Sequence, residues 1–199
     1  MAIRMTPITR QIINFVNENG FITTRICEKT IFKGNKQALI QSQAKLKSLY
    51  DNKILKRYSN KYNNEYIYYK SSRPTEHKKL ITELYSWLNY YTDEIIYFAK
   101  EQTFNKRRCD LNIVFKINNE ICGLWCEVDV NHPTTQKKLD EIYNDGFVQQ
   151  WYKDKFGVDY FPAFLVVTAT GDKKWAKDRD YMVFNCDYTF SQLPDILFN

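Results

Sequence analysis

Three carboxylates in the second half of the chain have the spacing of a metal-binding site. Glu127 and Asp129 are two residues apart in a predicted strand, so strand alternation places both side chains on one face. Asp110 opens the predicted strand before it. Carboxylate oxygens of this kind hold Mg²⁺ or Mn²⁺, and either ion can activate a water for attack on a phosphodiester. The alternative is that these residues are ordinary acids exposed at strand ends.

The elements that must position these carboxylates follow a regular order. A helix predicted from Pro74 to Tyr90 precedes strands over 94–101, 109–117 and 121–130. The chain then continues with a helix over 134–153, a buried strand over 164–167, a short helix near 173–177, a strand over 181–184 and a helical turn over 193–198. The order helix-strand-strand-strand-helix-strand resembles the common core of the PD-(D/E)XK, or restriction-endonuclease-like, fold, which keeps its site where these acids fall.

Two departures from that pattern weaken the expectation of cutting activity. Cys109 stands where a proline would precede Asp110, and Asp129 stands where the lysine of E-x-K belongs. That lysine positions the water and stabilises charge, so an acid cannot replace it. Lys137 or Lys138 on the following helix is placed to reach back. The candidate catalytic residues are therefore Asp110, Glu127, Asp129 and Lys138, and the departures favour a scaffold over a working nuclease.

The first part of the chain is strongly basic. Residues 1–75 contain 14 Lys and Arg against 4 Asp and Glu, a net charge of +10, whereas residues 76–199 contain 15 against 19, a net charge of −4. Cations that neutralise phosphates release condensed counterions, so a basic module of this size is typical of a nucleic-acid binder. A soluble cationic domain without such a partner is the alternative.

This basic segment has the element order of a winged helix-turn-helix. Helices are predicted over 6–19, 23–31 and 36–51, with Gly20 ending the first and a Gly-containing turn at 32–35 preceding the third. A β-hairpin over 54–58 and 65–70 with a basic tip follows. The segment 71–74 is the predicted boundary between domains of residues 1–72 and 73–199. The predicted fold class is α+β, a winged helix-turn-helix followed by a PD-(D/E)XK domain.

The third helix is the predicted DNA-reading element. At 100° per residue, one side gathers Leu39, Gln43, Leu46, Leu49 and Tyr50 and is expected to pack, and the other presents polar side chains suited to base edges. A solvated helix face, or use of the fold for protein–protein contact, is the alternative. The predicted DNA-binding residues are Lys36, Gln37, Gln41, Lys45, Ser48, Lys56, Arg57 and Lys61.

Composition and cysteine usage indicate a protein of the cytoplasm. The chain of 199 residues is 44% hydrophobic, enough for a core, but no apolar run reaches the roughly 18 residues that cross a bilayer. The N-terminus lacks the apolar region of a signal peptide. Five cysteines, an odd number, with only two histidines predict buried reduced thiols rather than disulfides or a zinc site.

Several short motifs together resemble the replication-relaxation family over about residues 6 to 170. They are the predicted winged helix and the segments Arg73-Pro74-Thr75-Glu76-His77, Arg108-Cys109-Asp110, Trp125-Cys126-Glu127-Val128-Asp129 and Lys138-Leu139-Asp140-Glu141-Ile142-Tyr143. Members of this family are similar to plasmid mobilisation accessory proteins of the MobC type. The resemblance implies a relaxosome component, which binds double-stranded plasmid DNA at the origin of transfer and helps a separate relaxase to nick one strand.

Two other functions remain open from the sequence. One is a metal-dependent nuclease that uses Asp110, Glu127 and a lysine from positions 137 and 138. The other is a winged-helix transcriptional regulator whose second domain senses a ligand or forms a dimer.

Overall fold

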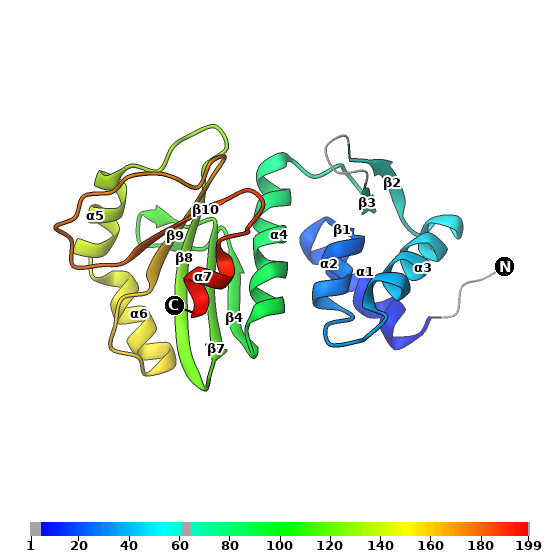
Figure 1. The fold of residues 1–199 in the computed structure, drawn as a ribbon, viewed down its shortest axis with the longest axis horizontal. Coiled ribbons are helices and arrows are strands. Elements are labelled where there is room, and N and C mark those ends of the chain that lie inside the picture. Colours follow the sequence, from blue (N-terminus) through cyan, green and yellow to red (C-terminus); the bar gives the residue numbers. More distant parts are fainter. Residues whose placement is uncertain (1–4, 61–64, 199) are drawn as a thin grey trace. The chain divides into compact units, whose positions relative to one another are not determined.

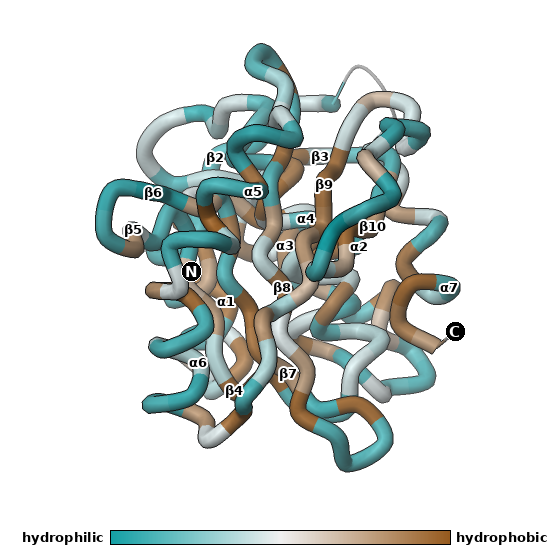
Figure 2. Tube along the Cα trace, turned by 90° about the vertical axis from the view of Figure 1, so that its left-hand side faces the viewer, coloured by the Kyte–Doolittle hydropathy of each residue, from teal (hydrophilic) through white to brown (hydrophobic). Residues whose placement is uncertain are grey.

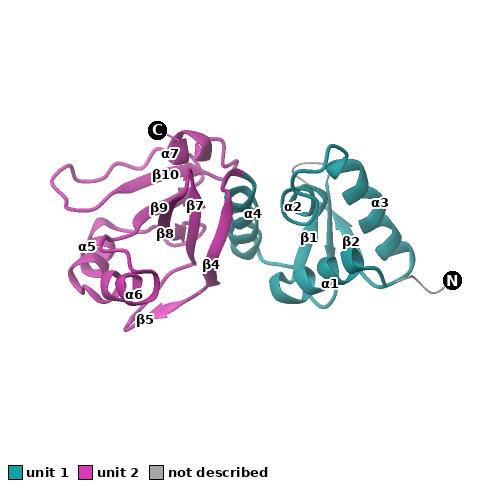
Figure 3. Ribbon diagram, turned by 90° about the horizontal axis from the view of Figure 1, so that it is seen from below, with its two compact units in different colours: residues 1–90 teal, residues 91–199 magenta. Residues whose placement is uncertain are grey.

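The chain is a mixed α+β protein with two compact units. The computed structural model describes residues 5–60 and 65–198, and it divides into Met1–Tyr90 and Tyr91–Asn199 (Figure 3). The first unit combines helices with a small antiparallel sheet, and the second builds a five-stranded mixed sheet with flanking helices (Figure 1). Within the described residues, no helix has both the length and the apolar character needed to cross a membrane.

Three helices begin the first unit, and local capping explains their ends. α1 (Pro7–Asn19) starts at Thr6, whose hydroxyl accepts from the Thr9 N–H, and ends at Gly20 with φ of 83°. α2 (Thr24–Thr30) starts at Thr23, which caps it in the same way. α3 (Ala38–Asp51) follows after a short turn. All three helices lie within two residues of their predicted bounds.

A three-stranded antiparallel sheet completes the first unit, in the order β1-β3-β2. The predicted hairpin is present as β2 (Lys56–Ser59) and β3 (Tyr66–Tyr69). β1 (Phe21–Thr23), which the sequence did not predict, connects α1 to α2 and pairs with β3. Three residues are too few to show a period-of-two pattern, so this strand depends on its pairing partner.

A single apolar cluster holds these elements together. It contains Phe15 and Val16 from α1, Leu46 and Leu49 from α3, and Ile67 from β3. The helix α4 (Glu76–Tyr91) adds Tyr85, whose ring centroid is 6.4 Å from that of Phe15. Residues 76–90 of α4 therefore group with the first unit. The predicted boundary between residues 72 and 73 is a statement about which segments fold independently. It stays a prediction.

The second unit is organised around a sheet in the order β10-β9-β8-β7-β4. The strands are β4 (Glu94–Lys100), β7 (Leu111–Ile117), β8 (Glu120–Val128), β9 (Ala163–Thr168) and β10 (Val183–Asp187). β4, β7 and β8 form an antiparallel meander, and β9 and β10 continue it in parallel. The two-residue strands β5 (Thr103–Phe104) and β6 (Arg107–Arg108) pair with each other in the β4–β7 connection.

Both faces of the central strands are covered, which explains their nearly continuous apolar sequences. The hydrophobic colouring of β9 is plain in Figure 2. On one face, Leu139 and Tyr152 pack with Trp125 and Phe164 in a single cluster. The opposite face carries Leu124 and a small apolar pocket that the helix α7 (Leu193–Phe198) helps to line. All five cysteines are free, and four of them are buried, as the sequence predicted.

Two predictions for this unit are wrong in detail. The single helix expected over 134–153 is two helices, α5 (Gln136–Asn144) and α6 (Phe147–Phe156), because Gly146 adopts a φ of 68° between them. The short helix expected near 173–177 is instead a loop without helical hydrogen bonding. That loop has a direct role in the acidic cluster described next.

Candidate functional site

The three predicted acids gather around the end of β8, but each is bound to protein groups. Asp110 directly precedes β7, and its backbone N–H donates to the Cys126 carbonyl at 3.1 Å. Its carboxylate accepts from the Val128 N–H at 2.7 Å. Asp110 thus links the start of β7 to the end of β8 through its side chain as well as its backbone.

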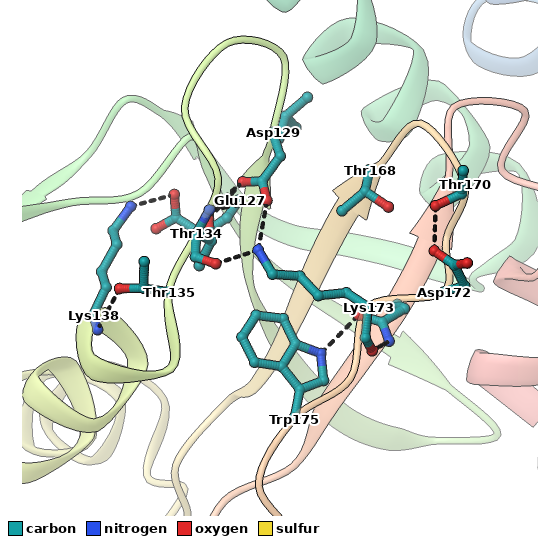
Figure 4. A network of polar contacts seen from close by, with 12 residues as sticks. Glu127, Asp129, Thr134, Thr135, Lys138, Thr168, Thr170, Asp172, Lys173 and Trp175 are labelled. Atoms are coloured by element: carbon teal, nitrogen blue, oxygen red, sulfur yellow. Dashed lines mark hydrogen bonds and ion pairs between the residues drawn. The ribbon is translucent and has the colours of Figure 1, made fainter.

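The buried Glu127 forms an ion pair with the half-buried Lys138. Its side chain is 4% exposed, and its Oε2 lies 2.7 Å from the Lys138 Nζ (Figure 4). Its Oε1 accepts from the Trp125 Nε1 at 2.8 Å. Lys138 lies in the first turn of α5, which Thr135 caps. Burial raises the pKa of Glu127, and the ammonium of Lys138 opposes that shift. The lysine expected to reach back from the helix therefore does contact Glu127.

Asp129 has a partner that the sequence did not indicate. Its Oδ2 lies 3.0 Å from the Lys173 Nζ, and both of its oxygens accept from the Thr134 N–H at 2.9 Å. Lys173 also donates to the Thr134 carbonyl, so it joins the end of β8 to the loop before α5 (Figure 4). Because Lys173 is 44 residues from Asp129 along the chain, no local spacing could have revealed the pair.

These contacts do not fit the predicted Mg²⁺ or Mn²⁺ site formed by Asp110, Glu127 and Asp129. Each carboxylate accepts from a backbone or side-chain donor, so a divalent ion would have to compete with that donor for the carboxylate. In residues 5–60 and 65–198, no group of three or more His, Cys, Asp or Glu is placed to hold a metal ion. As it stands in the structure, the arrangement is an ion-pair network that joins β8 to α5 and to the loop carrying Lys173.

In the first unit, α3 is rotated relative to the helical-wheel prediction. Leu39, Gln43 and Tyr50 were expected to pack, yet all three are exposed. The buried side instead includes Ser42 with Leu46 and Leu49. Ser42 is small enough to be buried although it is polar. A helical wheel that places every serine on the polar side therefore predicts the wrong buried face for α3. The outward face therefore differs from the predicted one.

Three of the predicted contacts on α3 are half-buried. Gln41 accepts from the Asn35 Nδ2 at 3.1 Å, and the Lys45 Nζ lies 3.4 Å from the Thr6 hydroxyl. Ser48 is the third. Lys36, Gln37 and Lys56 are exposed, as expected for DNA contacts, while Lys61 lies outside the described residues.

Arg57 is held between two aromatic rings. Its guanidinium carbon lies 4.1 Å from the ring centroids of both Tyr50 and Tyr66. The pKa of Arg57 is raised, mainly by a hydrogen bond with the Tyr68 side chain. These contacts fix the position of a cation at the base of the hairpin.

A shallow depression of about 430 Å³ lies beside the exposed face of α3. Arg25, Lys47 and Arg57 supply three cations to its lining, and Glu65 supplies a carboxylate that also accepts from the Arg25 N–H at 2.8 Å. The complete lining is Thr24, Arg25, Leu39, Gln43, Lys47, Arg57, Glu65, Tyr66 and Tyr68. Sequence reasoning missed Arg25, Gln43 and Lys47. We name this surface the α3 depression, and its excess of cations suits it to an anionic partner.

Comparison with known proteins adds no identification. No protein-family model, curated protein sequence or solved structure matches the chain.

Proposed function

We propose that the first unit binds double-stranded DNA through the α3 depression, as a winged helix-turn-helix does. The observation that carries this proposal is the placement of Arg25, Lys47 and Arg57 around the exposed face of one helix. Cations beside a helix contact phosphates while the helix enters the major groove. The order α1-β1-α2-α3-β2-β3 and the pairing of β1 with β3 support the same interpretation.

The charge of the chain supports a nucleic acid rather than another anion. The excess of cations falls in residues 1–75, whose net charge is +10, and not in the remainder, whose net charge is −4. A long polyanion engages many such cations together, and each neutralised phosphate releases counterions. A small anion would engage only the few that surround it.

For the second unit, we propose a restriction-endonuclease-like scaffold that does not cut DNA. The meander β4-β7-β8 followed by α5, α6 and the parallel β9 supports that fold. The ion pairs of Glu127 with Lys138 and of Asp129 with Lys173 support a structural use of the acids. The nuclease alternative predicts nicking of supercoiled plasmid by the pure protein with Mg²⁺ or Mn²⁺, abolished by Asp110→Ala.

Among DNA-binding proteins that do not cut DNA, we propose the role that the resemblance to the replication-relaxation family implies. The protein binds the origin of transfer on plasmid DNA and assists a separate relaxase. Nicking of supercoiled origin plasmid should then require the relaxase and increase when this protein is added. An unchanged rate would remove the accessory role and favour the winged-helix regulator, without affecting the proposal of DNA binding.

Titration of a fluorescent duplex with the full chain tests DNA binding itself. Lys47→Ala should weaken binding and reduce the slope of log affinity against log salt by about 1, because one phosphate contact is lost. Lys137→Ala is the matched control, since Lys137 is 86% exposed in the second unit. Equal effects of the two substitutions, or no binding by the unchanged chain, would contradict the proposal.

A further inference from the structure

We infer that α3 recognises an adenine–thymine base pair through Gln43 and Ile40, in place of the predicted Gln41. This inference rests on the proposed binding of double-stranded DNA. Ile40, Gln43, Ala44 and Lys47 have the spacing i, i+3, i+4 and i+7, so they form one stripe along the helix. All four are exposed, and the stripe borders the α3 depression through Gln43 and Lys47.

Ile40 is the least expected member of this stripe. It is 65% exposed, so a large apolar side chain stands in water near the start of α3. The apolar group that the major groove offers is the C5 methyl of thymine. Contact with that methyl would cover Ile40 and favour thymine over cytosine at the facing position.

Gln43 supplies the polar half of the recognition. It lines the α3 depression, where its amide is free of the helix packing that half-buries Gln41. A glutamine amide donates to N7 and accepts from N6 of adenine in one bidentate contact. Gln41 is a poorer candidate because its Oε1 already accepts from the Asn35 Nδ2.

Ala44 and Lys47 complete a surface shaped for the groove. The methyl side chain of Ala44 beside Ile40 and Gln43 permits close approach of the helix to base edges. Lys47, one turn beyond Gln43, then faces a phosphate rather than a base. The stripe thus combines one apolar contact, one bidentate contact and one phosphate contact.

Base analogues in duplexes test each contact separately, with the full chain. Duplexes enriched by binding from a random pool should share an adenine–thymine base pair at one position. Replacing the thymine of that base pair by deoxyuridine removes the methyl, and binding should weaken about threefold to fourfold. Replacing one adenine by 7-deazaadenine removes the N7 acceptor, and binding should weaken about 2-fold to 10-fold.

Substitutions assign these effects to residues. Ile40→Ala should abolish the sensitivity to deoxyuridine alone, and Gln43→Ala the sensitivity to 7-deazaadenine alone. Gln41→Ala is the matched control and should keep both. The inference is overturned if Ile40→Ala and Gln43→Ala keep the sensitivities, or if the chain binds all duplexes alike. In the second case the proposed function stands, whereas failure to bind any duplex would overturn both.

Discussion

Replacement of Lys138 by methionine should destabilise the second unit in a way that depends steeply on pH. Methionine keeps most of the aliphatic side chain but removes the ammonium that lies 2.7 Å from the Glu127 carboxylate. Glu127 is 4% exposed, so its charge would remain buried with the Trp125 N–H as its described side-chain donor. Breaking a buried ion pair on one side costs about 3–5 kcal/mol when both groups are fully buried.

The loss in the free energy of unfolding cannot exceed the cost of protonating Glu127, because a neutral Glu127 needs no ion-pair partner. The ordinary pKa of the glutamate is 4.5, and burial already raises it in the folded protein. Neutralising the group at pH 7 costs about 1.4 kcal/mol for each of the 2.5 pH units above that value, which is about 3.5 kcal/mol. At pH 5 the same step costs less than about 1 kcal/mol. Lys138 is itself 33% exposed, so the loss at pH 7 should be about 1–3 kcal/mol.

The sign of the pH dependence follows from the direction of the pKa shift. Removing the lysine raises the pKa of Glu127 further, so the folded variant binds a proton that its unfolded chain releases. The free energy of unfolding of Lys138→Met should therefore be nearly normal below about pH 4.5 and fall as the pH rises towards 7. A second substitution, Glu127→Gln, should remove most of this dependence.

Urea unfolding at pH 5 and pH 7, followed by tryptophan fluorescence, measures the effect. Lys137→Met is the matched control, because Lys137 is 86% exposed and lies 4.0 Å from Glu141, and its change should stay below about 0.5 kcal/mol at both pH values. An equal loss for Lys138→Met at both pH values, or a loss no larger than that of the control, would refute the reasoning about this ion pair.

Three further predictions concern other parts of the fold. Burial, with Glu65 nearby, raises the pKa of Glu83 from 4.5 to about 7, so the free energy of unfolding should fall between about pH 4.5 and pH 7. Glu83→Gln should make the free energy of unfolding less dependent on pH in that range. Urea unfolding midpoints measured against pH check both expectations. Gly123→Ala should destabilise by at least about 2 kcal/mol in thermal or urea unfolding, because an added Cβ would lie 2.4 Å from the buried Tyr152 ring. Thr23→Ala removes the cap of α2 and should cost about 1 kcal/mol by the same measurement, and Thr23→Ser should restore most of it.

The elements that could be predicted are those with local signals. Thr6 and Gly20 mark the two ends of α1, and both act as caps in the structure. The segments 54–58 and 65–70 on either side of a polar loop predicted the β2–β3 hairpin, which is present. Glu127 and Lys138 are close in sequence and lie on adjacent elements, so their contact was also within reach of spacing arguments.

The features that escaped prediction depend on contacts distant in sequence or on one residue's conformation. Lys173 reaches Asp129 only because the fold brings its loop to the end of β8. The left-handed conformation of Gly146 divides the segment predicted as one helix into α5 and α6. Ser42 is buried and Gln43 is exposed on α3, a placement that a hydropathy scale alone would not indicate.

The central claim is that the α3 depression is the DNA-binding surface, and lysine reactivity tests it most directly. Acetylation of the full chain with and without duplex DNA, read by mass spectrometry, compares exposed lysines of the two units. Lys47, which lines the α3 depression, should become protected by DNA, whereas Lys137 and Lys153 in the second unit should keep their reactivity. Protection confined to Lys137 and Lys153, with Lys47 unchanged, would contradict the account.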